Sequence, residues 1–138
     1  MINQFGNFNW LSVTVGAVVY FVLGALWFTV FFKREYALSL GKVNEPSQKP
    51  SPIFIIGPAI CTFVITITNA LFIYALHINS ISEAVELALI IGFGFLVANT
   101  INIAINPNIP RPILYGIISG SFHLMGITLV SIIIVSIR

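Results

Sequence analysis

Four long apolar runs divide the chain, and every charged residue lies between two of these runs or beside the end of one. The runs cover residues 10–32, 53–76, 87–105 and 113–137. Each is about as long as the roughly 20 residues that an α-helix needs to cross a hydrocarbon core about 30 Å thick. The pattern therefore predicts four membrane-spanning helices, because lipid cannot hydrogen-bond the backbone groups of open strands or loops.

The expected fold class is all-α: one integral membrane domain over residues 1–138, folded as an up-and-down bundle of four transmembrane helices. The helices are predicted at about residues 10–40, 53–76, 83–105 and 112–137. Gly41 is expected to end the first helix in a left-handed conformation. Ser80 and Glu83 have the spacing of a capping box at the start of the third helix. Residues 42–52, with three prolines, predict a flexible linker.

Composition excludes an ordinary soluble domain. Hydrophobic residues make up 58% of the chain and charged residues only 7%, whereas soluble proteins carry about 25% charged residues. The net charge of +2 comes without a basic cluster on one face, so nucleic-acid binding is not expected.

The basic residues also predict an orientation. Five of the six lie in the segments 33–52 and 106–111, and only Arg138 lies at the opposite side. Basic residues accumulate in cytoplasmic loops. We therefore expect a multi-pass protein of the cell membrane with both of these loops in the cytoplasm and both termini on the outer side.

Each predicted helix carries one face of polar or small residues at helical spacing. These faces are Gly16, Tyr20 and Trp27; Thr62, Thr66 and Asn69; Asn99, Asn102 and Asn106; and Gly116, Gly120 and His123. Such faces are expected to meet in the bundle interior, with the large aliphatic residues towards lipid. A rise of 1.5 Å per residue places His123, Tyr20 and Thr66 in one layer near the midplane, with Asn99 within reach.

An ionisable side chain at this depth is costly and marks a candidate functional site. The leading hypothesis is binding or passage of a small solute or lipid through the polar layer around His123. Its candidate residues for ligand binding or proton relay are His123, Tyr20, Asn69, Asn99, Asn102 and Thr66. One alternative is a structural or accessory membrane subunit, in which the same residues only hold helices together. A weaker alternative is a membrane enzyme resembling small glutathione-using four-helix proteins, for which the chain lacks inward Arg and Glu residues.

Glycines are assigned to close helix packing. They are Gly116, Gly120, Gly16 and Gly24. The small-xxx-small spacing of Gly116 and Gly120 also favours self-association, so a homo-oligomer is expected beside the lipid bilayer as partner. Neither a metal site nor a cofactor is expected, because no thiolate or carboxylate shares the predicted depth of His123.

Short aromatic-rich motifs carry a family resemblance. They are Asn9-Trp10, the segment from Gly24 to Phe28, the segment from Phe32 to Tyr36, and Phe122-His123. With these motifs the chain resembles a family of small bacterial membrane proteins known as domain of unknown function 1761. It departs from the family pattern at Lys33 (usually Gly), Val30 (often Pro) and Tyr36 (usually Trp). The resemblance implies a four-helix integral membrane protein and no particular activity, because none is established for the family.

Overall fold

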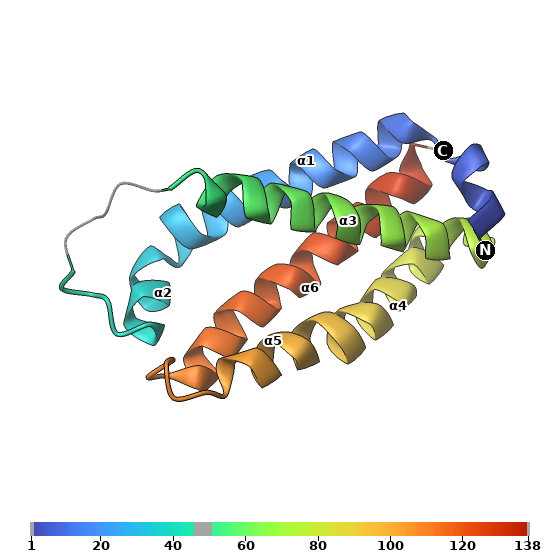
Figure 1. The fold of residues 1–138 in the computed structure, drawn as a ribbon. Helices are drawn as coiled ribbons and strands as arrows, with labels where there is room; N and C mark the ends of the chain where they lie inside the picture. The colour runs from blue at the N-terminus through green and yellow to red at the C-terminus, as the bar shows by residue number, and fades with distance from the viewer. Residues whose placement is uncertain (1, 46–50, 138) are drawn as a thin grey trace.

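The computed structural model describes residues 2–45 and 51–137, and these residues form helices joined by short connections (Figure 1). In chain order, the elements are the 3₁₀ helix η1 (Ile2–Asn7), α1 (Trp10–Leu26), the π-helical turn η2 (Trp27–Phe31), α2 (Lys33–Ser39), α3 (Ile53–Ala75), α4 (Ile81–Ile91), the π-helical segment η3 (Gly92–Val97), α5 (Ala98–Ala104) and α6 (Pro112–Ser136). The predicted all-α class is confirmed.

Four helical stretches are long and apolar enough to cross a membrane. They are Trp10–Phe31, Ile53–Ala75, Ile81–Ala104 and Pro112–Ser136. The chain is therefore a multi-pass membrane protein. Both termini lie at one end of the bundle (Figure 1). Which side of the membrane that end occupies stays a prediction.

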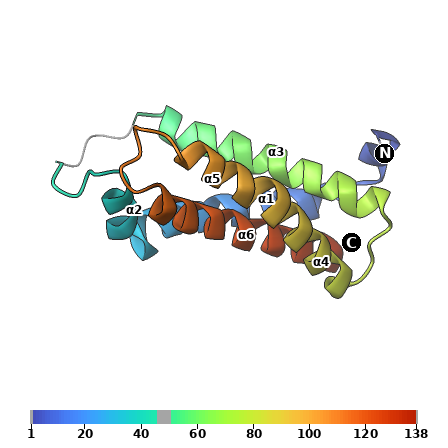
Figure 2. The ribbon, with the colours of Figure 1, turned by 90° about the horizontal axis from the view of Figure 1, so that it is seen from below.

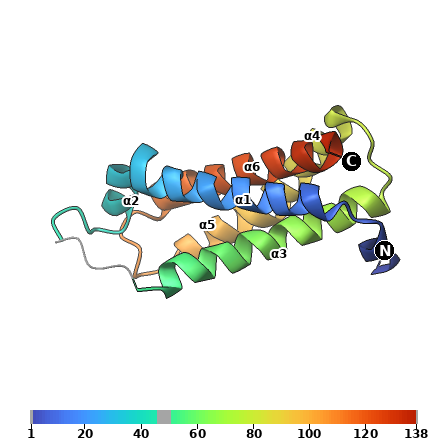
Figure 3. The same cartoon turned by 90° about the horizontal axis from the view of Figure 1, so that it is seen from above.

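The last helix, α6, is the centre of the bundle. It packs against α1, α3 and the α4–η3–α5 segment, and it is the most buried of the four spans. Figures 2 and 3 show these helices running lengthwise beside one another. Residues on α6 are consequently in position to meet residues from every other span.

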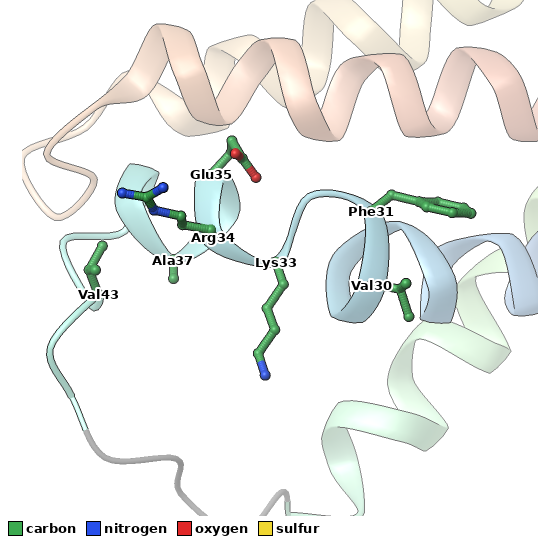
Figure 4. Close-up of a pocket in the computed structure, with 7 residues that line it drawn as sticks. All are labelled: Val30, Phe31, Lys33, Arg34, Glu35, Ala37 and Val43. Carbon is green, nitrogen blue, oxygen red and sulfur yellow. The ribbon is translucent and has the colours of Figure 1, made fainter.

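The first helix is not continuous to residue 40 as expected. Its α-helical part ends at Leu26, a π-helical turn follows, and Phe32 leaves helical geometry with φ −122° before α2 begins. Ring packing accounts for the break, because Trp27 stacks on Phe32 with ring centroids 4.7 Å apart and Phe28 packs on Tyr36 at the same separation. Figure 4 shows α2 displaced from the helix that precedes it.

Two helix ends have the predicted geometry. Gly41 follows α2 with φ 71°, in the left-handed region. The Ser80 hydroxyl accepts from the Glu83 N–H at 3.2 Å, and the Glu83 carboxylate accepts from the Ser80 N–H at 3.3 Å, which confirms the capping box. Part of the predicted linker 42–52, including Lys49, lies outside the described residues, and so does Arg138.

The inward face of the third span differs from the predicted one. Its inward residues are Ala84, Ala88 and Gly92, followed by Val97 and Ile101, which face Gly120 and Gly116 of α6. The step of five between Gly92 and Val97 arises in the π-helical segment η3, where the extra residue rotates everything that follows by about 100° relative to a regular helix. Asn99 and Asn102 are exposed as a result. The expectation that they face the bundle interior is wrong.

Candidate functional site

A direct hydrogen bond joins Tyr20 of α1 to His123 of α6. The Tyr20 hydroxyl lies 2.7 Å from His123 Nδ1, and the Tyr20 ring is 0% exposed. The ring fits because Gly126, one turn further along α6, has no side chain: a Cβ there would collide with the Tyr20 ring. Tyr20 also packs on Phe122, with ring centroids 5.3 Å apart. Tyr20 and His123, which were predicted from the rise per residue to lie at one depth, are therefore in direct contact.

The chemistry of this pair determines which hydrogens are available. A buried phenol needs an acceptor for its proton, and His123 Nδ1 is the acceptor the described residues supply. If the phenol donates, a neutral imidazole carries its own hydrogen on Nε2. No described residue pairs with that nitrogen, and the His123 side chain is only half-buried. The ring therefore presents one N–H donor for a further partner.

Ser119 belongs to the same face and was missed by sequence reasoning. It lies one turn before His123 on α6, a spacing that brings Cβ atoms to about 5–6 Å. Its side chain is 4% exposed, and its hydroxyl has no hydrogen-bond partner among the described residues. A serine hydroxyl in a helix commonly bonds to the carbonyl four residues back, so the sequence alone contains no signal that this one is unpaired.

Asn69 forms a second polar pair with Ser131. The Asn69 Nδ2 donates to the Ser131 hydroxyl at 2.7 Å, and that hydroxyl donates to the Ile127 carbonyl at 2.9 Å. Asn69 is 2% exposed, and its Oδ1 has no partner among the described residues. Ser131 was also missed by sequence reasoning, although it follows His123 by eight residues on one face of α6.

The remaining predicted residues do not join either pair. Thr66 is buried beside Gly16, and its hydroxyl donates to the Thr62 carbonyl of its own helix at 2.8 Å. Asn99 and Asn102 are exposed on α5. The predicted polar layer is thus two separate pairs, with Tyr20 and His123 in one and Asn69 in the other.

The four glycines assigned to packing all lie against a neighbouring helix of the same chain. A Cβ added to Gly116 would meet Ile101 at 3.0 Å, and one added to Gly24 would meet Phe122 at 3.0 Å. Gly120 lies against Val97, and Gly16 against Thr66 and Val130. These close approaches are within one molecule.

The described residues line two surface hollows. The larger, about 390 Å³, lies beside η2 and α2 and is lined by Lys33, Arg34 and Glu35 among others (Figure 4). Its two basic side chains point in different directions and share the rim with a carboxylate, so they do not converge on one anion. Nearby, burial and the adjacent Tyr115 hydroxyl raise the pKa of Tyr36 to about 12, which keeps this phenol neutral at physiological pH.

The smaller hollow, about 330 Å³, is an apolar groove between α3, the α4–η3 segment and Ile127 of α6. Asn69 is among its lining residues. Neither hollow is lined by Tyr20 or His123. Within residues 2–45 and 51–137, no three His, Cys, Asp or Glu residues are grouped to hold a metal ion.

A family model described as "Protein of unknown function (DUF1761)" matches residues 11–135, nearly the whole chain. The chain belongs to the DUF1761 family. Comparison with curated proteins and with solved structures found no significant match.

The motifs of the DUF1761 resemblance have definite positions in this structure. Asn9 caps α1 and binds two other helix ends. The Trp27 indole N–H donates to the Ile118 carbonyl of α6 at 3.0 Å, and Phe32 is the point at which the first span breaks. His123, in the last motif, pairs with Tyr20. Tyr36 of the third motif packs on Tyr115 of α6, with ring centroids 5.8 Å apart. The first three motifs therefore contact α6 or its C-cap, and the fourth lies on α6 itself.

Proposed function

We propose that this protein binds a small, mostly apolar molecule with a carbonyl-type oxygen, inside the membrane, at the Tyr20–His123 pair. The observation that carries the proposal is the 2.7 Å hydrogen bond between them, which engages one nitrogen of a half-buried imidazole and leaves the other without a partner among the described residues. An N–H donor within a membrane span attracts an acceptor more strongly than the same group in water, because the local dielectric constant is low. The ligand class that satisfies this donor is an apolar ketone, ester or quinone.

Ser119 adds to this site. Its hydroxyl, which has no partner within the described part of the chain, lies on the face of α6 that carries His123, one turn away. A hydroxyl can donate to the same carbonyl oxygen or accept from a second polar group of the ligand. Two donors at this spacing would orient a carbonyl compound, whereas a hydrocarbon gains nothing from either.

Binding is favoured over passage by the arrangement of polar groups along α6. The Tyr20–His123 and Asn69–Ser131 pairs are about 12 Å apart along the helix at 1.5 Å per residue. Between them lie Gly126, Ile127 and Val130, which are buried and apolar. A polar solute crossing the bundle would lose its hydrogen bonds over this interval.

A double substitution tests the site with the least damage to the fold. Removing both hydrogen-bonding partners together is close to neutral, whereas removing one leaves the other buried and unpaired at a cost of about 1–3 kcal/mol. We expect Tyr20→Phe/His123→Leu to remain folded in lipid nanodiscs. In wild-type protein, nonanone should shift the ¹⁵N resonances of the His123 ring in a saturable way, and decane should not.

The control is Ser121→Ala, an exposed serine on another face of α6, which should leave the nonanone titration unchanged. In the double variant, nonanone should no longer have a saturable effect on the resonances of residues close to Phe122, which lies outside the apolar groove. If nonanone perturbs the His123 ring no more than decane does, the binding proposal fails.

A structural or accessory role is the second candidate, and hydrogen bonds between helices favour it. Asn69 to Ser131, Trp27 to the Ile118 carbonyl and Asn9 to the Ile137 carbonyl each join two spans. If the double variant loses thermal stability or its native assembly while nonanone has no saturable effect on wild-type protein, the pair holds helices together and this second candidate is favoured.

We also propose that the connections at residues 33–52 and 106–111 lie on the cytoplasmic side of the cell membrane. They hold most of the basic residues, and basic residues are concentrated on that side. The two connections also lie together: the Arg111 N–H donates to the Ser39 carbonyl at 3.2 Å, and Gly41 approaches Pro110. The described parts of both connections therefore lie at the same end of the bundle.

A further inference from the structure

The end of the bundle that holds α2 carries four exposed cations. They are Lys33, Arg34, Lys42 and Arg111. No described carboxylate forms an ion pair with any of them. In the described part of the chain, the opposite end has Glu83 and Glu86 but neither lysine nor arginine. The two ends of the bundle therefore present opposite charges to their surroundings.

Two of these cations follow a membrane span directly. The first span ends at Phe31, and Lys33 and Arg34 are the first two residues of α2. Residues immediately beyond an apolar span lie at the level of the phospholipid headgroups. Tyr36 of α2 packs on Tyr115 of α6, and tyrosine is enriched at this level of a membrane. The start of α2 is therefore within reach of lipid phosphates.

The hollow beside α2 combines charged and apolar lining residues. On the side of the span it is lined by Val30 and Phe31, whose side chains are 62% and 58% exposed. It lies at the break at Phe32, where α2 is displaced from the preceding helix (Figure 4). Lys33 extends from one side of α2 and Glu35 from the opposite side (Figure 4). An amphiphile with an anionic head can therefore meet apolar residues with its tail and a cation with its head.

We propose that this hollow binds an anionic phospholipid. The lipid phosphate pairs with the Lys33 ammonium, and the first part of an acyl chain lies against Val30 and Phe31. Arg34 points away from Lys33 (Figure 4), so it does not bind the same phosphate. With the other cations of this end, it raises the local concentration of anionic headgroups, because each lysine or arginine near a membrane surface attracts them. The ligand site proposed at His123 plays no part in this binding.

Two other partners fit the hollow less well. A free phosphate ion gains nothing from the apolar wall, and Lys33 and Arg34 do not converge on it. Phosphatidylcholine carries a trimethylammonium group beyond its phosphate, which the cations of this end repel. Phosphatidylglycerol has an acyl chain for the wall and a net negative charge for Lys33.

The two tryptophans can report the lipids at opposite ends of the bundle. Trp27 lies one turn before Val30, and Trp10 begins α1 at the other end. The variant Trp10→Phe, which retains Trp27 alone, is placed in phosphatidylcholine nanodiscs containing either brominated phosphatidylglycerol or brominated phosphatidylcholine. Because bromine quenches tryptophan fluorescence at short range, the two titrations give the relative affinity of the two lipids.

We expect Trp27 to report a preference of about fivefold for phosphatidylglycerol, the effect of one cation near a membrane surface. This preference should decrease as NaCl is added, because salt screens exposed charges. The converse variant, Trp27→Phe, retains Trp10 and should report no preference for phosphatidylglycerol.

Charge substitutions in the Trp10→Phe protein separate a binding site from general attraction. Lys33→Gln should abolish the preference for phosphatidylglycerol, and Lys33→Arg should retain it. Lys42→Gln is the matched control: it removes the same charge at the same end, but Lys42 does not line the hollow. We expect this control to lower the preference by less than about twofold, because exposed charges at a distance are screened.

Three results would overturn the proposal. Equal quenching of Trp27 by the two brominated lipids would show that the hollow does not select an anionic lipid. Equal losses from Lys33→Gln and Lys42→Gln would show diffuse attraction without a site. Displacement of the lipid by water-soluble glycerophosphoglycerol would show that the cations bind a free anion. The lipid comparison uses protein with an intact hollow, so misfolding of a charge variant does not remove the test.

Discussion

A single residue, Asn9, joins the ends of three helices through its side chain and its backbone N–H. Its Oδ1 caps α1 by accepting from the Leu11 N–H at 3.0 Å. Its Nδ2 donates to the Ile137 carbonyl at the end of α6, and its backbone N–H donates to the Tyr74 hydroxyl of α3 at 3.0 Å. The sequence identified Asn9 only as part of a family motif. Its contact with Ile137 spans almost the whole chain and could not be read from local spacing.

Replacement of Asn9 should therefore destabilise the bundle at this end. We expect Asn9→Ala to lower the free energy of unfolding by about 0.5–2 kcal/mol, the range for loss of an N-cap, as measured by denaturant titration in detergent micelles. Asn9→Asp keeps the capping acceptor but sets a carboxylate oxygen, which cannot donate, against the Ile137 carbonyl, so it should also destabilise the bundle. A stability of Asn9→Ala equal to that of wild type would contradict the role described for this side chain.

The α4–η3–α5 segment shows how one element sets the direction of all residues after it. Small residues at intervals of four, Ala84, Ala88 and Gly92, let this segment approach α6 closely. The π-helical turns of η3 then rotate the following residues, so Val97 and Ile101 continue the contact and Asn99 faces outward. The alanine spacing was available in the sequence. The π-helical segment was not, because it depends on how the segment packs against α6.

Two neighbouring residues of α4 test this packing. Ala88 is 0% exposed and Leu89 is 42% exposed. We expect Ala88→Leu to lower the free energy of unfolding by about 1–3 kcal/mol, because it overpacks a close helix contact. Leu89→Ala should change it by less than about 0.5 kcal/mol, as is usual for surface substitutions. Thermal unfolding in the same detergent measures both, and equal effects would contradict the assigned face.

At the scale of the whole molecule, the exposed amides of α5 bear on self-association. The sequence argument for a homo-oligomer used Gly116 and Gly120, but these glycines contact α5 and η3 of the same chain. Asn99 and Asn102 lie instead on the outer face of a membrane span, one turn apart. An amide both donates and accepts, so it can pair with its copy in a second molecule.

We propose that the protein associates with a second copy through this face. Asn99→Leu/Asn102→Leu should shift the population from dimer towards monomer by several-fold, as measured by sedimentation equilibrium in detergent. Thr14→Leu removes an exposed polar residue from α1 and serves as the control. A wild-type protein that is monomeric at all accessible concentrations would refute the proposal, as would a double variant that dimerises like wild type.

The sequence by itself determined the number of spans, the all-α class and the helix ends at Gly41 and Ser80, because these depend on hydrophobic run length and on local capping chemistry. It also brought Tyr20 and His123 to one depth, since rise per residue is constant along a helix. Only the tertiary structure decided which faces meet. Ring packing around Phe32 broke the first helix, the π-helical η3 turned Asn99 and Asn102 outward, and packing around α6 left Ser119 and Asn69 Oδ1 unpaired. These outcomes depend on contacts between distant residues, which local sequence patterns do not encode.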